Sequence, residues 1–395
     1  MRPARGVAGP IPGPVTAAVF LIFAALGAEV AAYGPAIPHI EHRFGLGPAT
    51  AGLIVTAHFL GGFVGIAAFG LSHLRWPMHR RLTVAGVVAG GGLLLAAVAP
   101  AWPLLMVATV VVGVAYGGLG VSINVLCATG YDTRSPAMLA LVNAAYGTGG
   151  FVSPALVALV HGYSPVLAGA GAITLACSVG LRRAPTPSAP PVAVGSIAGR
   201  RTRRLIIGFA VLLFAEVGVE SGVGTWETTH LIALGWSSGF AAGATSAYWG
   251  AFAVGRLLCA PLTLRWAPQR LIYVSLTLVT VVLVLVDAHV APPLMYALAG
   301  LCVSPMFALV LTWLSRLTPR AGTATTYVML GAVLGSACLP AALGSLISLA
   351  GVEYLPLGLA SCSVAALGIA VLISVDTRRD QPAVGITSVA APIVG

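Results

Sequence analysis

The sequence predicts an all-α membrane protein with twelve transmembrane helices in two six-helix bundles. Of its 395 residues, 58% are hydrophobic and only 8% are charged, and the mean hydropathy is +0.99. A soluble domain carries roughly 25% charged residues, so this chain cannot cover a water-facing surface. Its apolar residues fall into twelve long stretches, and its two halves resemble each other. The composition excludes a disordered chain, a coiled coil, a disulfide scaffold and a soluble α/β enzyme.

The apolar stretches define the expected helices, because about 20 apolar residues are needed to cross the hydrocarbon core. In the first half they cover residues 15–38, 50–73, 82–99, 103–128, 137–160 and 163–181. In the second half they cover 204–226, 240–263, 270–290, 292–314, 322–349 and 353–375. Helix-breaking residues separate them, at Gly45–Pro48, Pro100, Pro136, Pro268, Pro292–Pro293 and Pro319.

The longest break divides the chain in two. Between Arg182 and Arg204 the sequence is rich in proline and arginine, which is typical of a linker. We therefore expect an N-terminal bundle over residues 1–181, a linker over 182–203 and a C-terminal bundle with a short tail over 204–395. The first apolar stretch is too long for a signal peptide and contains Glu29, so we expect an uncleaved first helix.

The placement of arginine predicts the topology. All 20 basic residues are arginines, and with the N-terminus inside, all but two fall on cytoplasmic segments. The exceptions are Arg43, on the outside, and Arg256, within a helix. This pattern follows the positive-inside rule and accounts for the net charge of +10 without a nucleic-acid partner. We expect a multi-pass protein of the plasma membrane, surrounded by the lipid bilayer, with both termini in the cytoplasm.

The two halves share an internal repeat at a shift of about 190 residues. The related pairs are Leu74–Trp76 with Leu264–Trp266, Gly27–Glu29 with Gly218–Glu220, His39 with His230, and Gly149 and Pro154 with Gly335 and Pro340. Parallel repeats of six helices imply two bundles related by an axis along the membrane normal. A binding site is then expected between the bundles at mid-depth.

Together these features resemble the major facilitator superfamily. The superfamily's loop motif, G-x-x-x-D-R-x-G-R-R, is similar to the segment Gly70–Arg81, although Leu74 replaces the acid and Met78 the second glycine. The resemblance covers essentially the whole chain and implies a monomeric secondary transporter that works by alternating access. No Walker motif and no local catalytic motif is present, so we expect neither direct ATP drive nor an enzyme.

Within the superfamily, the segment Gly218–Trp226 resembles the seventh helix of the fucose-permease-like sugar–proton symport branch. Asn124, and Asn143 with Gly147, are similar to that branch as well. This resemblance implies uptake of a sugar or a similar small polar solute together with a proton. A polyol site usually needs several amides, and the chain has only these two asparagines in its helices. The alternative is therefore a proton-driven exporter of an amphipathic, drug-like compound.

Three acids are expected well inside the helices: Glu29, Glu216 and Glu220. An ionisable residue at that depth is costly and is by default a functional hypothesis. A carboxyl there can take a proton from one side of the membrane and release it on the other. Glu216 and Glu220 are four residues apart and share one helix face, and Glu29 is the repeat-related residue of Glu220. We expect these acids to carry the proton; the alternative is a structural role or a wet position near the outer interface.

Arg256 is the only arginine expected inside the membrane, and an unpaired guanidinium there is costly. We expect it to balance charge in a salt bridge to Glu216 or Glu220; the alternative is a position near the cytoplasmic end of its helix. The candidate substrate contacts are polar or amphipathic side chains at mid-depth: Tyr33, His58, Asn124, Asn143, Tyr146, Trp226, Tyr248 and Trp249.

Each of these contacts has an alternative role. The asparagines can bond neighbouring helices, Trp226 and Tyr33 can belong to an interfacial belt, and His58 can be a proton relay or a helix-packing histidine. The glycine-rich segment Gly113–Gly120 lies in a membrane helix, which favours close helix packing over a nucleotide-binding loop. The cysteines and remaining histidines lack metal-ligand spacing, so we expect no metal and no cofactor.

Overall fold

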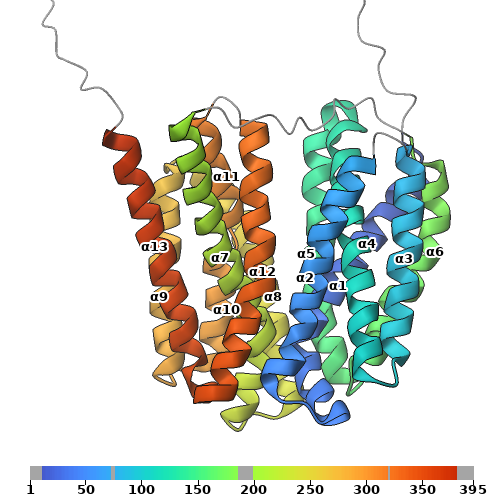
Figure 1. Cartoon of the computed structure of the whole chain (residues 1–395), viewed down its shortest axis with the longest axis horizontal. Helices are drawn as coiled ribbons and strands as arrows, with labels where there is room; N and C mark the ends of the chain where they lie inside the picture. Colours follow the sequence, from blue (N-terminus) through green and yellow to red (C-terminus); the bar gives the residue numbers. More distant parts are fainter. Residues whose placement is uncertain (1–10, 73–75, 186–198, 319–320, 380–395) are drawn as a thin grey trace, which may run out of the picture.

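The computed structural model describes residues 11–72, 76–185, 199–318 and 321–379, which form helices and short connections without any strand (Figure 1). The first half contains α1 (Gly13–Phe44), α2 (Pro48–Ser72), α3 (Met78–Val98), α4 (Trp102–Thr129), α5 (Ser135–Leu159) and α6 (Ser164–Gly180). The second half contains α7 (Arg200–Ala233), α8 (Ser238–Thr263), α9 (Pro268–Asp287), α10 (Pro292–Val303), α11 (Met306–Leu317), α12 (Ala321–Ala350) and α13 (Leu355–Arg379).

These helices form twelve membrane spans in two six-helix bundles. Among the described residues, ten helical segments are long and apolar enough to cross a membrane, and α10 and α11 count together as one of them. α5 and α8, which are rich in small and polar residues, complete the twelve. The tenth span was expected as a single helix, but it breaks between Val303 and Met306. Pro305 explains the break, because it lacks the backbone N–H that a continuous helix needs.

The internal repeat reappears in the packing. Within the first bundle α1 packs on α5, α2 on α4, and α3 on α6; in the second, α7 packs on α12, α8 on α10, and α9 on α13. The repeat-related glycines, Gly149 and Gly335, make the same kind of close helix contact in the two halves. A Cβ on Gly149 would lie 1.8 Å from the carbonyl oxygen of Ala24, and one on Gly335 would lie 2.1 Å from that of Phe214. Only glycine permits these close helix contacts.

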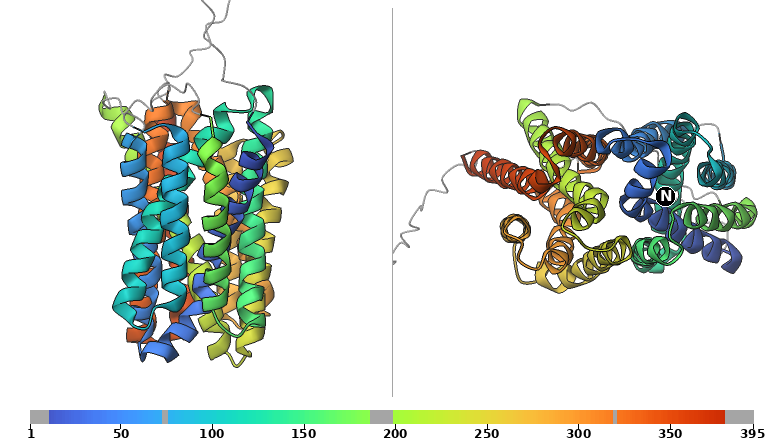
Figure 2. Two further views of the ribbon diagram at one scale, coloured as in Figure 1. Left: turned by 90° about the vertical axis from the view of Figure 1, so that its right-hand side faces the viewer. Right: turned by 90° about the horizontal axis from the view of Figure 1, so that it is seen from below.

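The two bundles lie side by side, and the axes of all their helices are roughly aligned (Figures 1 and 2). We call the end of the molecule where α6 ends and α7 begins the linker face, and the other end the opposite face. α1 begins and α13 ends at the linker face, which is at the top of Figure 1. Most of the expected linker, residues 186–198, lies outside the described residues, so the expected bundle boundaries stay a prediction.

Two helices continue further toward the opposite face than expected. α1 runs to Phe44 rather than residue 38, and α7 runs to Ala233 rather than residue 226. Both extensions are polar, which is why apolar length alone placed the ends too early. Because α7 is longer than expected, Glu227 also lies within it and is fully buried. The expectation of only three acids well inside the helices was therefore wrong.

Candidate functional site

A buried polar cluster occupies the middle of the first bundle. Glu29 lies midway along α1, and its Oε1 atom is 2.9 Å from Nδ1 of His58 on α2. The hydroxyl of Tyr33, one turn further along α1, donates to Glu29 Oε1 at 2.5 Å and lies 3.2 Å from His58 Nδ1. Glu29 and His58 are completely buried. The structure thus brings together a predicted acid and two predicted substrate contacts, in an arrangement that can share a proton among three groups.

Two tyrosines extend this cluster toward the second bundle. The ring of Tyr116 on α4 packs edge-on against His58, with centroids 4.8 Å apart, and its hydroxyl is 3.3 Å from that of Tyr146 on α5. Tyr116 reaches this position because Gly113 lets α4 approach α2 closely. A Cβ on Gly113 would lie 2.0 Å from the carbonyl oxygen of His58. Sequence reasoning found the close packing of this glycine segment but missed the tyrosine within it.

The acids of the second bundle lie on α7, across from these tyrosines. Glu220 is partly buried and lies within electrostatic range of both Tyr116 and Tyr146. Glu216, one turn closer to the linker face, is buried, and neither of its carboxylate oxygens has a hydrogen-bond partner among the described residues. Glu220 therefore lies across the boundary from the first bundle's tyrosines, and Glu216 interacts with Glu220 from one turn further along the same helix.

Arg256 does not form the expected salt bridge. It lies close enough to Glu216 and Glu220 to interact electrostatically, but among the described residues no ion pair joins it to either acid. Its guanidinium instead lies over the ring of Phe252, 4.5 Å from the centroid, and the side chain is exposed. The position, in the last third of α8 toward the linker face, agrees better with the alternative of a helix-end arginine, whose long side chain can reach the membrane interface.

Aromatic side chains from α8 complete the second bundle's side of the site. The hydroxyl of Tyr248 donates to the backbone oxygen of Glu220 at 2.9 Å, and its ring packs edge-on against Trp249. Trp249 in turn packs edge-on against Phe252, and its indole N–H is buried without a hydrogen-bond partner among the described residues. A buried indole donor without a partner is unusual, which keeps Trp249 a candidate for the site.

The two asparagines are bonded mainly within the protein. The amide nitrogen of Asn124 donates to the oxygen of Gly120 at 2.8 Å, and that of Asn143 donates to the oxygen of Leu139 at 2.8 Å. Asn143 also lies 3.5 Å from the side-chain oxygen of Asn124, which joins α5 to α4. Only this last contact supports the interhelix alternative, because the other two bonds lie within one helix, and the role of the asparagines as substrate contacts stays a prediction.

Trp226 lies apart from this site and closes the boundary between the bundles. It is fully buried, and its indole N–H donates to the oxygen of Pro340 at 2.8 Å. Its ring packs against Gly52 of α2 and Gly344 of α12, where an added Cβ would lie 2.5 and 2.7 Å away. This geometry favours a packing role over either an interfacial belt or a substrate contact.

Further contacts join the halves between the central cluster and the opposite face. The backbone N–H of Ala49 donates to Ser348 Oγ at 3.1 Å, and the hydroxyl of Thr56 donates to the oxygen of Ala337 at 2.7 Å. A Cβ on Gly34 would lie 2.1 Å from the oxygen of Gly224, so α1 and α7 touch directly. The bundles meet at the bottom of Figure 1 and diverge toward the linker face at the top. The described contacts therefore hold the two halves together near the opposite face.

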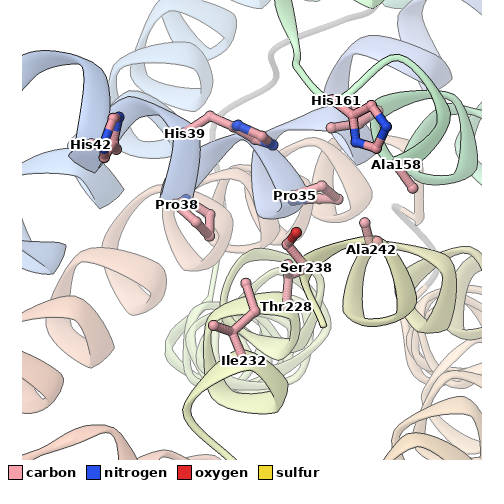
Figure 3. A pocket seen from close by; sticks show the side chains of 12 residues that line it. Pro35, Pro38, His39, His42, Ala158, His161, Thr228, Ile232, Ser238 and Ala242 are labelled. Carbon is pink, nitrogen blue, oxygen red and sulfur yellow. The ribbon is translucent and has the colours of Figure 1, made fainter. Parts of the chain in front are cut away.

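A pocket of about 300 Å³ opens at the opposite face, between the ends of α1, α5 and α7 and the start of α8 (Figure 3). Three histidines surround its mouth: His39, His42 and His161. In the part of the chain that the structure describes, no three His, Cys, Asp or Glu side chains are arranged to hold a metal ion. The polar side chains of the pocket are therefore the three histidines at its mouth and Thr228 and Ser238 on its wall.

Comparisons with known proteins agree with this architecture. The chain is similar in fold to a crystal structure of a point mutant of the nucleoside transporter NupG, with a TM-score of 0.75 and 12% identity over 91% of this chain and 98% of the other. It is similar to a D-xylose-proton symporter, with a TM-score of 0.74 and 13% identity over 90% and 96% of the chains.

It is also similar to a bacterial homolog of the human lysosomal transporter Spinster in an inward-facing conformation, with a TM-score of 0.69 and 14% identity over 91% and 95%. No curated protein sequence matches the chain. The sequence profile of the Major Facilitator Superfamily matches residues 19–287, which is more than half of the chain. With twelve spans, two repeated bundles and a central polar site, this chain belongs to the Major Facilitator Superfamily and is a membrane transporter rather than an enzyme.

Proposed function

We propose that this transporter couples the uptake of a small polar solute to the entry of protons, by alternating access between the two bundles. The observation that carries this proposal is the buried group of Glu29, His58 and Tyr33. A carboxyl, an imidazole and a phenol within hydrogen-bond distance can hold a proton in more than one place. Such a group has no evident structural need to be ionisable, since apolar packing would stabilise the same position at lower cost.

The orientation follows from the arginines. The linker face carries the arginine-rich segments and is the cytoplasmic side, and the opposite face is external. The described conformation, held together at the opposite face, is then open toward the cytoplasm. The protein works as a monomer in the plasma membrane, with bundles over residues 1–181 and 204–395 moving against each other across the linker at 182–203.

The proposed solute contains a ring. Tyr116 and Tyr146 of the first bundle are half-buried beside the boundary, and Trp249 lies in the second bundle; a ring-shaped solute could stack on such rings and bond their polar edges. The solved structures of similar fold include transporters named for a nucleoside and for D-xylose, both of which are ring-shaped polar solutes. Glu220 would bind the solute's hydroxyls, because it faces Tyr116 and Tyr146 and is only partly buried.

The test combines ligand binding with gradient-driven transport. Purified protein is heated with D-xylose, with uridine and with the apolar cation tetraphenylphosphonium, and stabilisation identifies the bound class. A ligand at 100 times its Kd should stabilise the folded protein by about 2.7 kcal/mol. The stabilising compound is then offered to vesicles with an inward proton gradient. Accumulation of a sugar or nucleoside supports the proposal; stabilisation by the apolar cation alone, with proton-driven expulsion, replaces it with the exporter.

A further inference from the structure

A fourth buried acid, Glu227, lies near the end of α7 and is not part of the central site. Its side chain is 0% exposed, and neither carboxylate oxygen has a hydrogen-bond partner of normal geometry among the described residues. No arginine or protonated histidine is paired with it in the described structure. A carboxylate ion in this position would be unpaired and removed from water, which is costly, so this environment tolerates the neutral, protonated acid.

The groups around Glu227 are hydroxyls and aromatic rings. The hydroxyl of Thr245 on α8 is close to the carboxyl, and it lies 2.8 Å from the hydroxyl of Thr228 on α7. Tyr248 of α8 and Tyr296 of α10 are within electrostatic range, and Tyr296 is bonded to Nδ1 of His230 at 2.9 Å. The titratable groups near Glu227 are therefore these two tyrosines and His230, none of which supplies a fixed positive charge.

Thr228 connects this acid to the pocket at the opposite face. The same residue that bonds Thr245 lines the pocket of about 300 Å³, and Figure 3 shows it on the pocket wall across from His39 and His161. The pocket has room for several water molecules. Solvent in the pocket, the Thr228 hydroxyl and the Thr245 hydroxyl thus form a short sequence of groups that ends at Glu227.

Tyr248 lies between Glu227 and the acids of the central site. The hydroxyl of Tyr248 donates to the backbone oxygen of Glu220, and Tyr248 lies within electrostatic range of Glu220, Glu216 and Glu227 together. Glu227 therefore lies between the pocket at the opposite face and the acids at the bundle boundary.

We propose that Glu227 is a second proton-binding site, which exchanges its proton with the opposite face through the pocket and the Thr228–Thr245 hydroxyl pair. A hydronium ion in the pocket water gives a proton to the Thr228 hydroxyl and becomes water; Thr228 passes its own proton to Thr245, which passes its own to the carboxylate. Both hydroxyls end unchanged and the carboxylate becomes a carboxylic acid. The part that this proton plays in transport rests on the proposed coupling, whereas the exchange itself does not.

Infrared spectroscopy of the full chain in lipid vesicles tests the proposal without a transported solute. A protonated carboxyl has a C=O stretching band well above that of a carboxylate, and the band shifts in heavy water. The spectrum of wild type minus that of Glu227→Gln at neutral pH should contain such a band, which is the contribution of the Glu227 carboxyl alone. The matched control is Glu353→Gln, because Glu353 is an exposed acid in the same half and its loss should leave the band unchanged. Glu227→Asp keeps a carboxyl and should keep a shifted band.

The route is tested by the rate at which the band shifts after external heavy water is added. Thr228→Val removes one hydroxyl of the pair, and Ala158→Trp fills the pocket from α5 without altering either hydroxyl. Each should slow the shift by about tenfold or more. A Glu227→Gln spectrum identical to wild type overturns the proposal, as do unchanged exchange rates in both route variants. Loss of the band on adding sodium chloride at constant pH would assign a metal-cation site instead. Neither measurement depends on transport, so this proposal can be overturned while the proposed function stands, and the reverse.

Discussion

The imidazole of His58 on α2 lies 2.9 Å from the carboxylate of Glu29 on α1, and neither side chain is exposed. The two residues belong to neighbouring helices of one bundle, so their attraction holds α1 against α2. That attraction depends on where the shared proton lies, because a neutral acid and a neutral imidazole attract each other far less than an ion pair does. Loading or unloading a proton here therefore changes how two helices at the bundle boundary pack.

Glu29→Gln should abolish proton-driven accumulation while leaving solute exchange intact. An inward gradient of one pH unit carries about 1.4 kcal/mol and can drive roughly tenfold accumulation of a neutral solute with one proton. Glutamine keeps the shape of the side chain and cannot change its protonation. The measurement is uptake of the stabilising sugar or nucleoside into vesicles, with and without the gradient, beside exchange at equal concentrations.

Glu353→Gln serves as the control for this measurement, because that acid is exposed at the opposite face and distant in sequence from the cluster. It should accumulate solute as wild type does. Full gradient-driven accumulation by Glu29→Gln would remove Glu29 from the coupling and leave Glu220 as the candidate acid. A variant that loses exchange as well as accumulation would show that Glu29 is needed for binding or movement.

His58→Leu should destabilise the protein by about 3 kcal/mol, because it removes the imidazole that pairs with the buried Glu29 carboxyl and leaves only the Tyr33 hydroxyl bonded to it. The double variant Glu29→Gln, His58→Leu should recover most of that loss, since no charge is then buried unpaired. Thermal unfolding in detergent at neutral pH measures both. Equal stabilities of the single and double variants would mean that the pair contributes nothing to packing and that the two residues act independently.

Much of the fold could be predicted from local properties of the sequence. Apolar length identified the twelve spans, and the spacing of Gly149 and Gly335 indicated a repeat whose two glycines make matching contacts in α5 and α12. The ends of the helices were harder to predict, because polar residues such as Glu227 and His230 suggest that a span has already ended. Their polarity is tolerated only because α8 and α10 cover them, which is a property of the tertiary structure.

The side-chain partners of the site were less accessible to prediction. Glu29 and His58 were both found as candidates, but 29 residues of separation do not reveal that their side chains meet. Tyr116 was hidden in a glycine-rich segment whose spacing predicts close approach of α4 to α2 without saying which ring that approach positions. Arg256 was paired with an acid on grounds of cost, yet its guanidinium lies over the ring of Phe252, a contact that the sequence spacing alone does not single out.

Gly149→Ala should destabilise the first bundle by about 2 kcal/mol, because its Cβ would lie 1.8 Å from the carbonyl oxygen of Ala24. Gly335→Ala should behave similarly, since a Cβ there meets Phe214 at 2.1 Å. The control is Gly91→Ala in α3, where no atom lies within 4 Å and alanine should gain about 1 kcal/mol of helix propensity. Thermal unfolding midpoints compare the three; a neutral Gly149→Ala would contradict the close α1–α5 contact.

Cross-linking α2 to α12 at the opposite face should stop transport reversibly. The backbone nitrogen of Ala49 is 3.1 Å from Ser348 Oγ, so cysteines at these two positions are within reach of a disulfide. Cys338 is exposed on α12 and is replaced by serine in the background to prevent side reactions. Oxidation should trap the halves in their described arrangement, and a reducing agent should restore uptake.

The reason is geometric, because alternating access requires these contacts to separate when the site opens to the other side. Ala49→Cys alone, in the same background and under the same oxidation, should keep full activity. Mass spectrometry of the oxidised protein establishes that the Ala49–Ser348 link has formed, independently of uptake. A fully cross-linked protein that still accumulates solute would mean that α2 and α12 stay together throughout the cycle, and that the site opens to the outside along the α5–α8 boundary instead.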